Sequence, residues 1–134
     1  MAEKILIIDD DPDAVLFLST VLRDHGYSTI DARNGEEGFQ KAKSDMPDLI
    51  LLDLMMPQKS GIALLSDLSK EASLKEIPVI MVTGVTGETG IDLEAFFERS
   101  ASSDVEDDPL RTEGYIAKPV DPQKLLRLVR KVLA

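Results

Sequence analysis

The feature that most constrains the fold of this chain is a series of short apolar runs separated by amphipathic stretches. Three runs, at residues 5–8, 49–52 and 79–82, are continuous and rich in branched side chains. Runs of this kind are typical of strands that are buried on both faces of a parallel sheet. Two weaker strands are predicted at residues 28–31 and 114–117.

Helical patterns lie between the predicted strands. The first helix is predicted to begin after Asp11, which can cap it, and to end at Gly26. Others are expected at residues 34–44, 62–71 and from 121 onward, where apolar residues recur at spacings of three and four. Because strands and helices alternate, we expect one α/β domain over residues 1–134, a doubly wound parallel sheet flanked by helices. In such a sheet the functional crevice lies at the carboxyl ends of the strands.

Composition excludes several classes of function. The chain has 134 residues, 43% of them hydrophobic and 30% charged, which is typical of a globular protein. It contains no cysteine, so disulfides and thiolate metal sites are excluded. No apolar stretch approaches the roughly 20 residues that span a bilayer, and no signal peptide is recognisable, so we expect a cytoplasmic protein. The formal net charge of −10 argues against direct binding to nucleic acid or to an anionic membrane.

Polar residues that can bind a cation or take part in a reaction follow four of the predicted strands. Asp9 and Asp10 follow the first, Asp53 the third, Thr83 the fourth and Lys118 the fifth. One aspartate after a strand is usually a turn or a helix cap. Since the carboxyl ends of parallel strands meet at one edge of the sheet, however, these residues are expected to converge. The sequence therefore predicts a site that combines carboxylates, a hydroxyl group and an ammonium group.

The predicted cluster of carboxylates needs a cation, because neighbouring carboxylates repel each other when ionised. Mg²⁺ takes oxygen ligands and commonly uses one or two carboxylates together with phosphate and water. We expect Asp10 and Asp53 to be direct ligands, and the backbone carbonyl of Met55 to supply a third oxygen. Asp9 is expected to lie close enough to act through water.

A carboxylate can also act as a nucleophile toward phosphorus and form an aspartyl phosphate. Asp53 is the predicted acceptor, and the surrounding groups would mainly position the phosphoryl group and neutralise its charge. Lys118 would neutralise phosphoryl oxygens, and the Thr83 hydroxyl would donate a hydrogen bond to one of them. No general base is required on the protein, since the attacking carboxylate is already ionised.

As an ordered set, these motifs resemble the receiver domains of two-component response regulators. The matching stretches are residues 5–12, 48–57 with Gly61 after them, 79–84 and 114–119, so the resemblance covers nearly the whole chain. It implies a flavodoxin-like, five-stranded parallel sheet in the order 2-1-3-4-5. It also implies a sensor histidine kinase or phosphotransfer protein as phosphoryl donor and a downstream protein as target.

The resemblance also implies a switch. Thr83 would shift toward the phosphoryl group, and Tyr115 would turn inward into the space left behind, which changes the partner preference of the neighbouring surface. A static, half-buried aromatic is the alternative for Tyr115. By the same resemblance, the bond between Lys118 and Pro119 should be cis.

One segment departs from the family pattern. Lys118 lies 35 residues after Thr83, which is longer than usual, and residues 84–113 hold nine acidic and two basic residues, a net charge of −7. Residues 91–99 could form a helix within this acidic insertion. The insertion either forms or masks a partner surface, or it is a solvated segment with no role of its own.

Two other functions compete with the receiver interpretation. A phosphatase of the haloacid dehalogenase type would use Asp9 as nucleophile, but Asp13 stands where that pattern has threonine or valine. A phosphorylation-independent interaction module of receiver fold would need none of the chemical positions, all of which are filled here. We expect no turnover enzyme and no output domain within these 134 residues; a stand-alone protein and a domain of a longer one both remain open.

Overall fold

The computed structural model describes residues 3–53, 61–83, 114–117 and 120–133. Within them, five strands form one parallel sheet in the order β2-β1-β3-β4-β5, as predicted. The strands are β1 (Lys4–Ile8), β2 (Ser28–Ala32), β3 (Leu49–Asp53), β4 (Val79–Thr83) and β5 (Gly114–Ala117). Each agrees with its sequence prediction to within one residue at either end.

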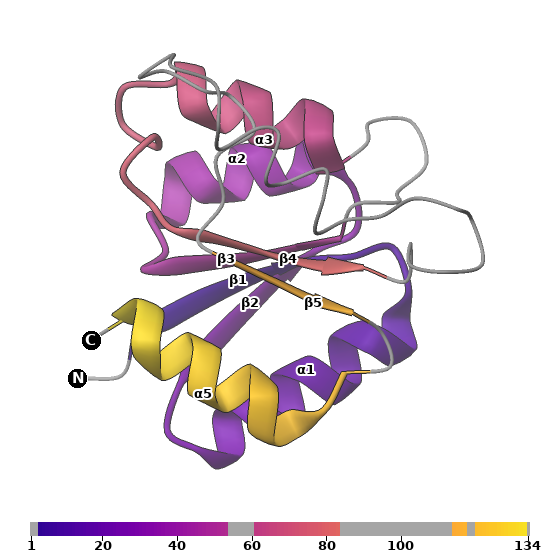
Figure 1. Cartoon of the computed structure of the whole chain (residues 1–134). Helices are drawn as coiled ribbons and strands as arrows, with labels where there is room; N and C mark the ends of the chain where they lie inside the picture. The colour runs from indigo at the N-terminus through magenta and orange to yellow at the C-terminus, as the bar shows by residue number, and fades with distance from the viewer. Residues whose placement is uncertain (1–2, 54–60, 84–113, 118–119, 134) are drawn as a thin grey trace.

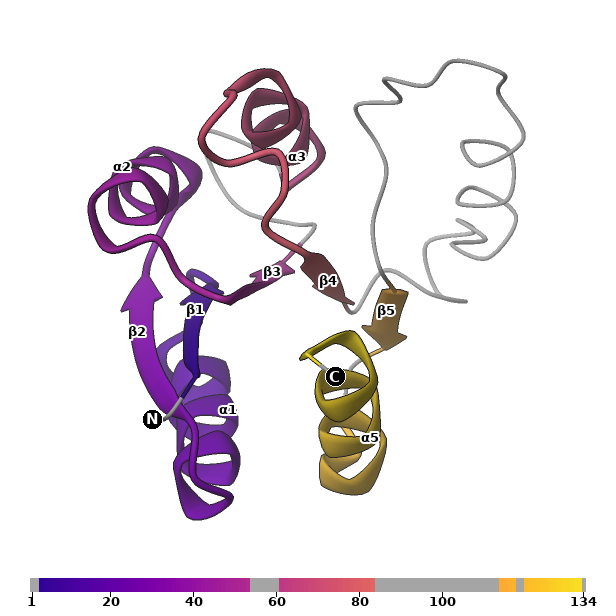
Figure 2. The ribbon, with the colours of Figure 1, turned by 90° about the vertical axis from the view of Figure 1, so that its left-hand side faces the viewer.

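Helices cover both faces of the sheet. They are α1 (Pro12–Asp24), α2 (Gly35–Asp45), α3 (Gly61–Lys70) and α5 (Pro122–Leu133). Helices α2 and α3 lie on one face, and α1 and α5 lie on the other (Figures 1 and 2). The doubly wound arrangement and the four helices are therefore confirmed. The helix expected at residues 91–99 and the rest of the acidic insertion lie outside the described residues.

Two separate apolar cores result from the alternation of side chains along the buried strands. Ile8 of β1 and Leu52 of β3 pack with α2 and α3, in a core that also contains Leu64. The residues one position earlier, such as Leu51, point to the opposite face and pack with helices α1 and α5. Every residue of β3 is buried, so this strand is the centre of both layers. The strand that ends at Asp53 is thus rigidly held from both sides.

Both ends of α1 have the features that its sequence predicted. The Asp11 carboxylate accepts a hydrogen bond from the Asp13 N–H at 3.0 Å, which caps the first turn. After the last turn Gly26 has a φ of 90°, a conformation that glycine adopts at low cost. There the N–H of Tyr27 donates to the carbonyl of Leu22 at 3.1 Å, as in a Schellman motif. The helix boundaries therefore follow from local sequence.

Helix α2 begins as predicted but ends in an unexpected way. Asn34 accepts a hydrogen bond from the Glu37 N–H at 2.8 Å through its side-chain oxygen, which caps the helix start. The helix ends at Asp45, and the capping residue after it, Met46, has a left-handed conformation with a φ of 46°. Glycine or asparagine usually takes this position, so the residue type gave no signal for it.

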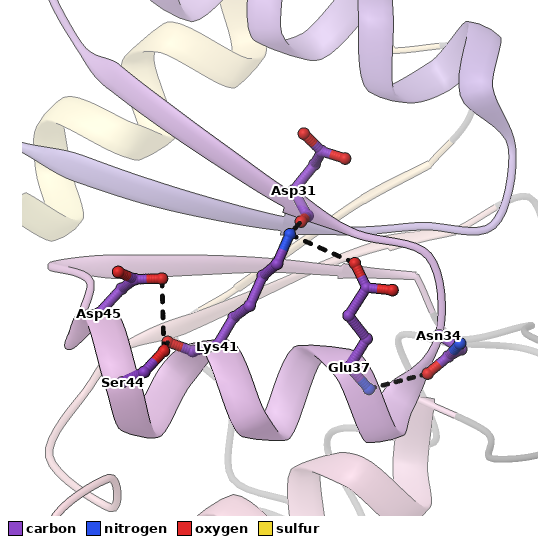
Figure 3. Close-up of polar contacts among 6 residues, drawn as sticks. All are labelled: Asp31, Asn34, Glu37, Lys41, Ser44 and Asp45. Carbon is purple, nitrogen blue, oxygen red and sulfur yellow. Dashed lines mark hydrogen bonds and ion pairs between the residues drawn. The ribbon is translucent and has the colours of Figure 1, made fainter.

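Strand β2 is an edge strand of the sheet, and the side chain of Lys41 from α2 covers part of its open side. The Ala32 carbonyl accepts the Asp9 N–H at 3.0 Å, so the preceding carbonyl, that of Asp31, faces away from β1. Lys41 donates its ammonium group to this carbonyl and lies 3.3 Å from a carboxylate oxygen of Glu37 (Figure 3). A paired lysine at this position also discourages pairing with the strand of another molecule.

Replacing Lys41 with methionine should lower the free energy of unfolding by about 1 kcal/mol, since it removes one hydrogen bond and one half-exposed ion pair. The aliphatic stem is largely kept, so packing should change little. Urea denaturation measures the effect. Lys70→Met is the matched control, because Lys70 is an exposed helical lysine and should change stability by less than about 0.5 kcal/mol. Equal stability of the two variants would refute the role of Lys41.

Candidate cation and phosphoryl site

Three carboxylates come together at the carboxyl edge of the sheet. Asp9 and Asp10 directly follow β1, and Asp53 is the last residue of β3. These strands are neighbours and pair Ile8 with Leu52, which brings Asp9 and Asp53 level with each other. Each of the three residues offers a carboxylate oxygen, and these oxygens all lie within 4.8 Å of one another. The structure thus confirms the predicted convergence of the acidic residues.

The three carboxylates differ in their exposure to solvent. Asp9 is 2% exposed and Asp53 is 5% exposed, whereas Asp10 is exposed. A buried carboxylate is costly unless hydrogen bonds or a counter-charge compensate for lost hydration. For Asp9 part of that compensation is the Asp11 N–H, which donates to Asp9 Oδ1 at 2.9 Å. The sequence predicted Asp11 only as a helix cap, and this contact was not predicted.

The donor set fits a hard divalent cation. Among the residues that the structure describes, it consists of carboxylate oxygens without a nitrogen or sulfur ligand, and two of the three residues are buried while one is open to solvent. Transition metals such as zinc favour histidine and cysteine, whereas Mg²⁺ favours oxygen and keeps part of its water shell. An acidic triad of this kind is typical of a Mg²⁺ site.

Two further predicted residues lie on strands that end at the same edge. β3 and β4 pair Asp53 with Val82, so Thr83 is one position farther along β4. Thr83 is in turn paired with Ala117, the last residue of β5. Tyr115 lies two positions earlier in β5. The backbone of Thr83 therefore lies at the same edge of the sheet as Asp53, and Tyr115 lies on the neighbouring strand. Their side chains are outside what the structure describes, so their roles stay predictions.

Other predicted features fall outside the described residues altogether. These are the backbone carbonyl of Met55, the ammonium group of Lys118 and the Lys118–Pro119 bond. Their assignments stay predictions. His25, by contrast, is described, and it caps the end of α1 with its Nδ1 2.9 Å from the Val21 carbonyl oxygen. His25 is therefore a helix-end residue, and it is not part of the acidic cluster.

A comparison with protein families gives a match over most of the chain. The family model described as the response regulator receiver domain matches residues 5–130. Protein PilH of Pseudomonas aeruginosa is 34% identical over 131 residues, and the match covers 98% of each chain. The probable transcriptional regulator ycf27 of Porphyridium aerugineum is 36% identical over 135 residues. That match takes in 98% of this chain but 48% of the regulator, so this chain spans about half the regulator's length.

Solved structures of similar fold cover nearly the whole chain. The chemotaxis protein CheY4 of Vibrio cholerae superposes with a TM-score of 0.81 at 27% identity, over 99% of this chain and 100% of that one. The receiver domain of the sensor histidine kinase PA1611 of Pseudomonas aeruginosa superposes with a TM-score of 0.78 at 21% identity, over 99% and 98%. The structure of that receiver domain holds a magnesium ion in its active-site cleft.

Proposed function

Because this chain belongs to the response regulator receiver family, we propose that it works in two-component signalling by accepting a phosphoryl group on Asp53. The observation that carries the proposal is the position of Asp53 at the end of β3, within one cluster with Asp9 and Asp10. As a receiver domain the chain is a signalling protein rather than an enzyme that turns over an external substrate.

Mg²⁺ is the proposed cofactor. Asp10 and Asp53 would bind it directly, Asp9 would act through water, and the Met55 carbonyl would supply another oxygen. The all-carboxylate cluster supports this assignment, as does the magnesium ion in the receiver domain of kinase PA1611. When bound, the ion would offset the negative charge that the carboxylates and the phosphoryl oxygens bring together.

The proposed reaction is a transfer of a phosphoryl group from a phosphohistidine to Asp53. A carboxylate oxygen of Asp53 forms the new bond to phosphorus, while the bond from phosphorus to the imidazole nitrogen of the donor breaks. The electron pair of the broken bond stays on that nitrogen. Because the phosphorylated ring carries a proton from solvent on its other nitrogen, the donor leaves as a neutral imidazole. Lys118 and Thr83 would hold the phosphoryl oxygens by an ionic contact and a hydrogen bond.

The proposed consequence of phosphorylation is a change of partner. Thr83 would move toward the phosphoryl group and Tyr115 would move inward, and the surface near β5 would then favour a downstream protein. The donor would be a sensor histidine kinase or a phosphotransfer protein.

We propose that residues 1–134 form one receiver domain with an acidic insertion around 84–113, and that it acts in the cytoplasm without contacting nucleic acid directly. Among the described helices, none is both long and apolar enough to cross a bilayer.

Acetyl phosphate tests the proposal without a cognate kinase. Incubation of the protein with acetyl phosphate and Mg²⁺ should add one phosphoryl group in intact-mass spectra, and chelation of the metal by EDTA should prevent it. Beryllofluoride, which mimics a phosphoryl group bound to an aspartate, should change the amide NMR spectrum around Asp53 when Mg²⁺ is present. A chain that responds to neither reagent would instead be a phosphorylation-independent interaction module.

A further inference from the structure

Helix α1 begins directly at the acidic cluster, and Asp11 connects the two. Its backbone N–H donates to Asp9 Oδ1 at 2.9 Å, while its side chain accepts the Asp13 N–H at 3.0 Å. Its carbonyl accepts the N–H of Val15 at 3.1 Å, which is the first hydrogen bond of the helix. One residue therefore joins a carboxylate of the cluster to the first turn of α1.

Asp11 itself is not one of the three cluster residues. Those whose carboxylate oxygens lie within 4.8 Å of one another are Asp9, Asp10 and Asp53, and the Asp11 carboxylate is engaged with the Asp13 N–H. The exposed Asp10 lies between Asp9 and Asp11, and hydrogen bonds hold both of these neighbours. In addition to accepting the Asp11 N–H, Asp9 donates its own N–H to the Ala32 carbonyl at 3.0 Å. The conformation at residues 9–11 thus determines where the Asp9 and Asp10 carboxylates stand.

We infer that Asp11 is a positioning residue for the cation site, an inference that rests on the proposed function. Its side chain fixes the first turn of α1, and this directs its own N–H at the Asp9 carboxylate. Groups that orient metal-binding carboxylates by hydrogen bonds contribute to metal affinity without touching the metal. Without the cap, residues 9–11 relax, and Asp9 loses the donor that orients it.

Two substitutions at this position separate the cap from the charge. Asp11→Ala removes both the capping oxygen and the negative charge, whereas Asp11→Asn removes the charge and keeps an oxygen that can cap. Any difference between them therefore reports on the cap alone. Mg²⁺ affinity, measured by isothermal titration calorimetry on the unphosphorylated protein, should be about tenfold weaker for Asp11→Ala than for Asp11→Asn.

Asn34→Ala is the matched control, because Asn34 caps α2 by the same kind of hydrogen bond, to the Glu37 N–H at 2.8 Å. It should lower the melting temperature about as much as Asp11→Ala does, yet leave the Mg²⁺ dissociation constant at the wild-type value. Equal Mg²⁺ affinity of Asp11→Ala and Asp11→Asn, or an equal loss in Asn34→Ala, would overturn the inference alone. A wild-type protein that does not bind Mg²⁺ would overturn the proposed function and the inference with it.

Discussion

Replacing Asp53 with asparagine should reduce phosphorylation by acetyl phosphate at least about a thousandfold, as expected when the attacking nucleophile is removed. The amide is nearly the same size as the carboxylate, so the almost fully buried site should keep its packing. It carries no charge, however, and its oxygen is a far weaker nucleophile toward phosphorus. Intact-mass spectra recorded over time measure the loss, and circular dichroism shows that the variant is folded.

Asp48→Asn is the matched control, because it removes the same negative charge from an aspartate that lies away from the acidic cluster. Asp48 directly precedes β3, at the opposite end of the same strand, and it is exposed. Its carboxylate accepts the Lys4 N–H at 2.7 Å, a contact that the asparagine oxygen can reproduce. This variant should be phosphorylated at the wild-type rate. A phosphoryl adduct that persists in Asp53→Asn would contradict the assignment of Asp53 as acceptor.

Replacing Leu52 with alanine should lower the free energy of unfolding by about 3 kcal/mol, within the range found for buried leucines. Leu52 is 0% exposed and belongs to the core between the sheet and helices α2 and α3. The loss combines the transfer free energy of the missing methine and methyl groups with the cost of the cavity that they leave. Urea denaturation, monitored by far-ultraviolet circular dichroism, measures the loss.

Leu16→Ala provides the comparison for this substitution. Leu16 has the same side chain but lies on the outer face of α1 and is 66% exposed. Removing it from a helix surface should change the free energy of unfolding by less than about 0.5 kcal/mol. Similar effects at the two positions would show that the core around β3 is not packed as the structure describes.

The sequence predicted the strands well because each central strand is a continuous apolar run. Ile5 to Ile8 and Leu49 to Leu52 have no polar residue and are short and rich in branched side chains, a pattern that favours strands buried on both faces. The strand at Ser28–Ala32 was harder to identify, since it is an edge strand and only its last residue is buried. The starts of α1 and α2 were predicted equally well, because Asp11 and Asn34 are residue types that cap helices.

Features that depend on one local conformation or on distant contacts could not be predicted. Nothing in the type of Met46 signals a left-handed helix end. The contact between Lys41 and the Asp31 carbonyl exists only because α2 packs beside the edge strand. The turn after α3 likewise buries Leu74 fully, although the sequence around it is mostly polar.

The acidic part of the site was predictable because topology alone brings its members together. Asp9 follows β1 and Asp53 is the last residue of β3, and a parallel sheet in this order places the ends of these neighbouring strands side by side. The hydrogen bond from the Asp11 N–H to Asp9 required atomic detail, since a run of three aspartates does not reveal which one orients another. The contributions of Met55, Lys118 and the Tyr115 side chain stay predictions.

The most direct test of Asp53 as the phosphoryl acceptor is to locate the phosphoryl group on the chain. Borohydride reduces an aspartyl phosphate to a homoserine residue, which survives proteolysis and can be assigned by peptide mass spectrometry. After reaction with acetyl phosphate and Mg²⁺, the reduced residue should be found at position 53 and at no other aspartate. A reduced residue at position 9 instead would contradict the account, because it would make Asp9 the nucleophile, as in a phosphatase of the haloacid dehalogenase type.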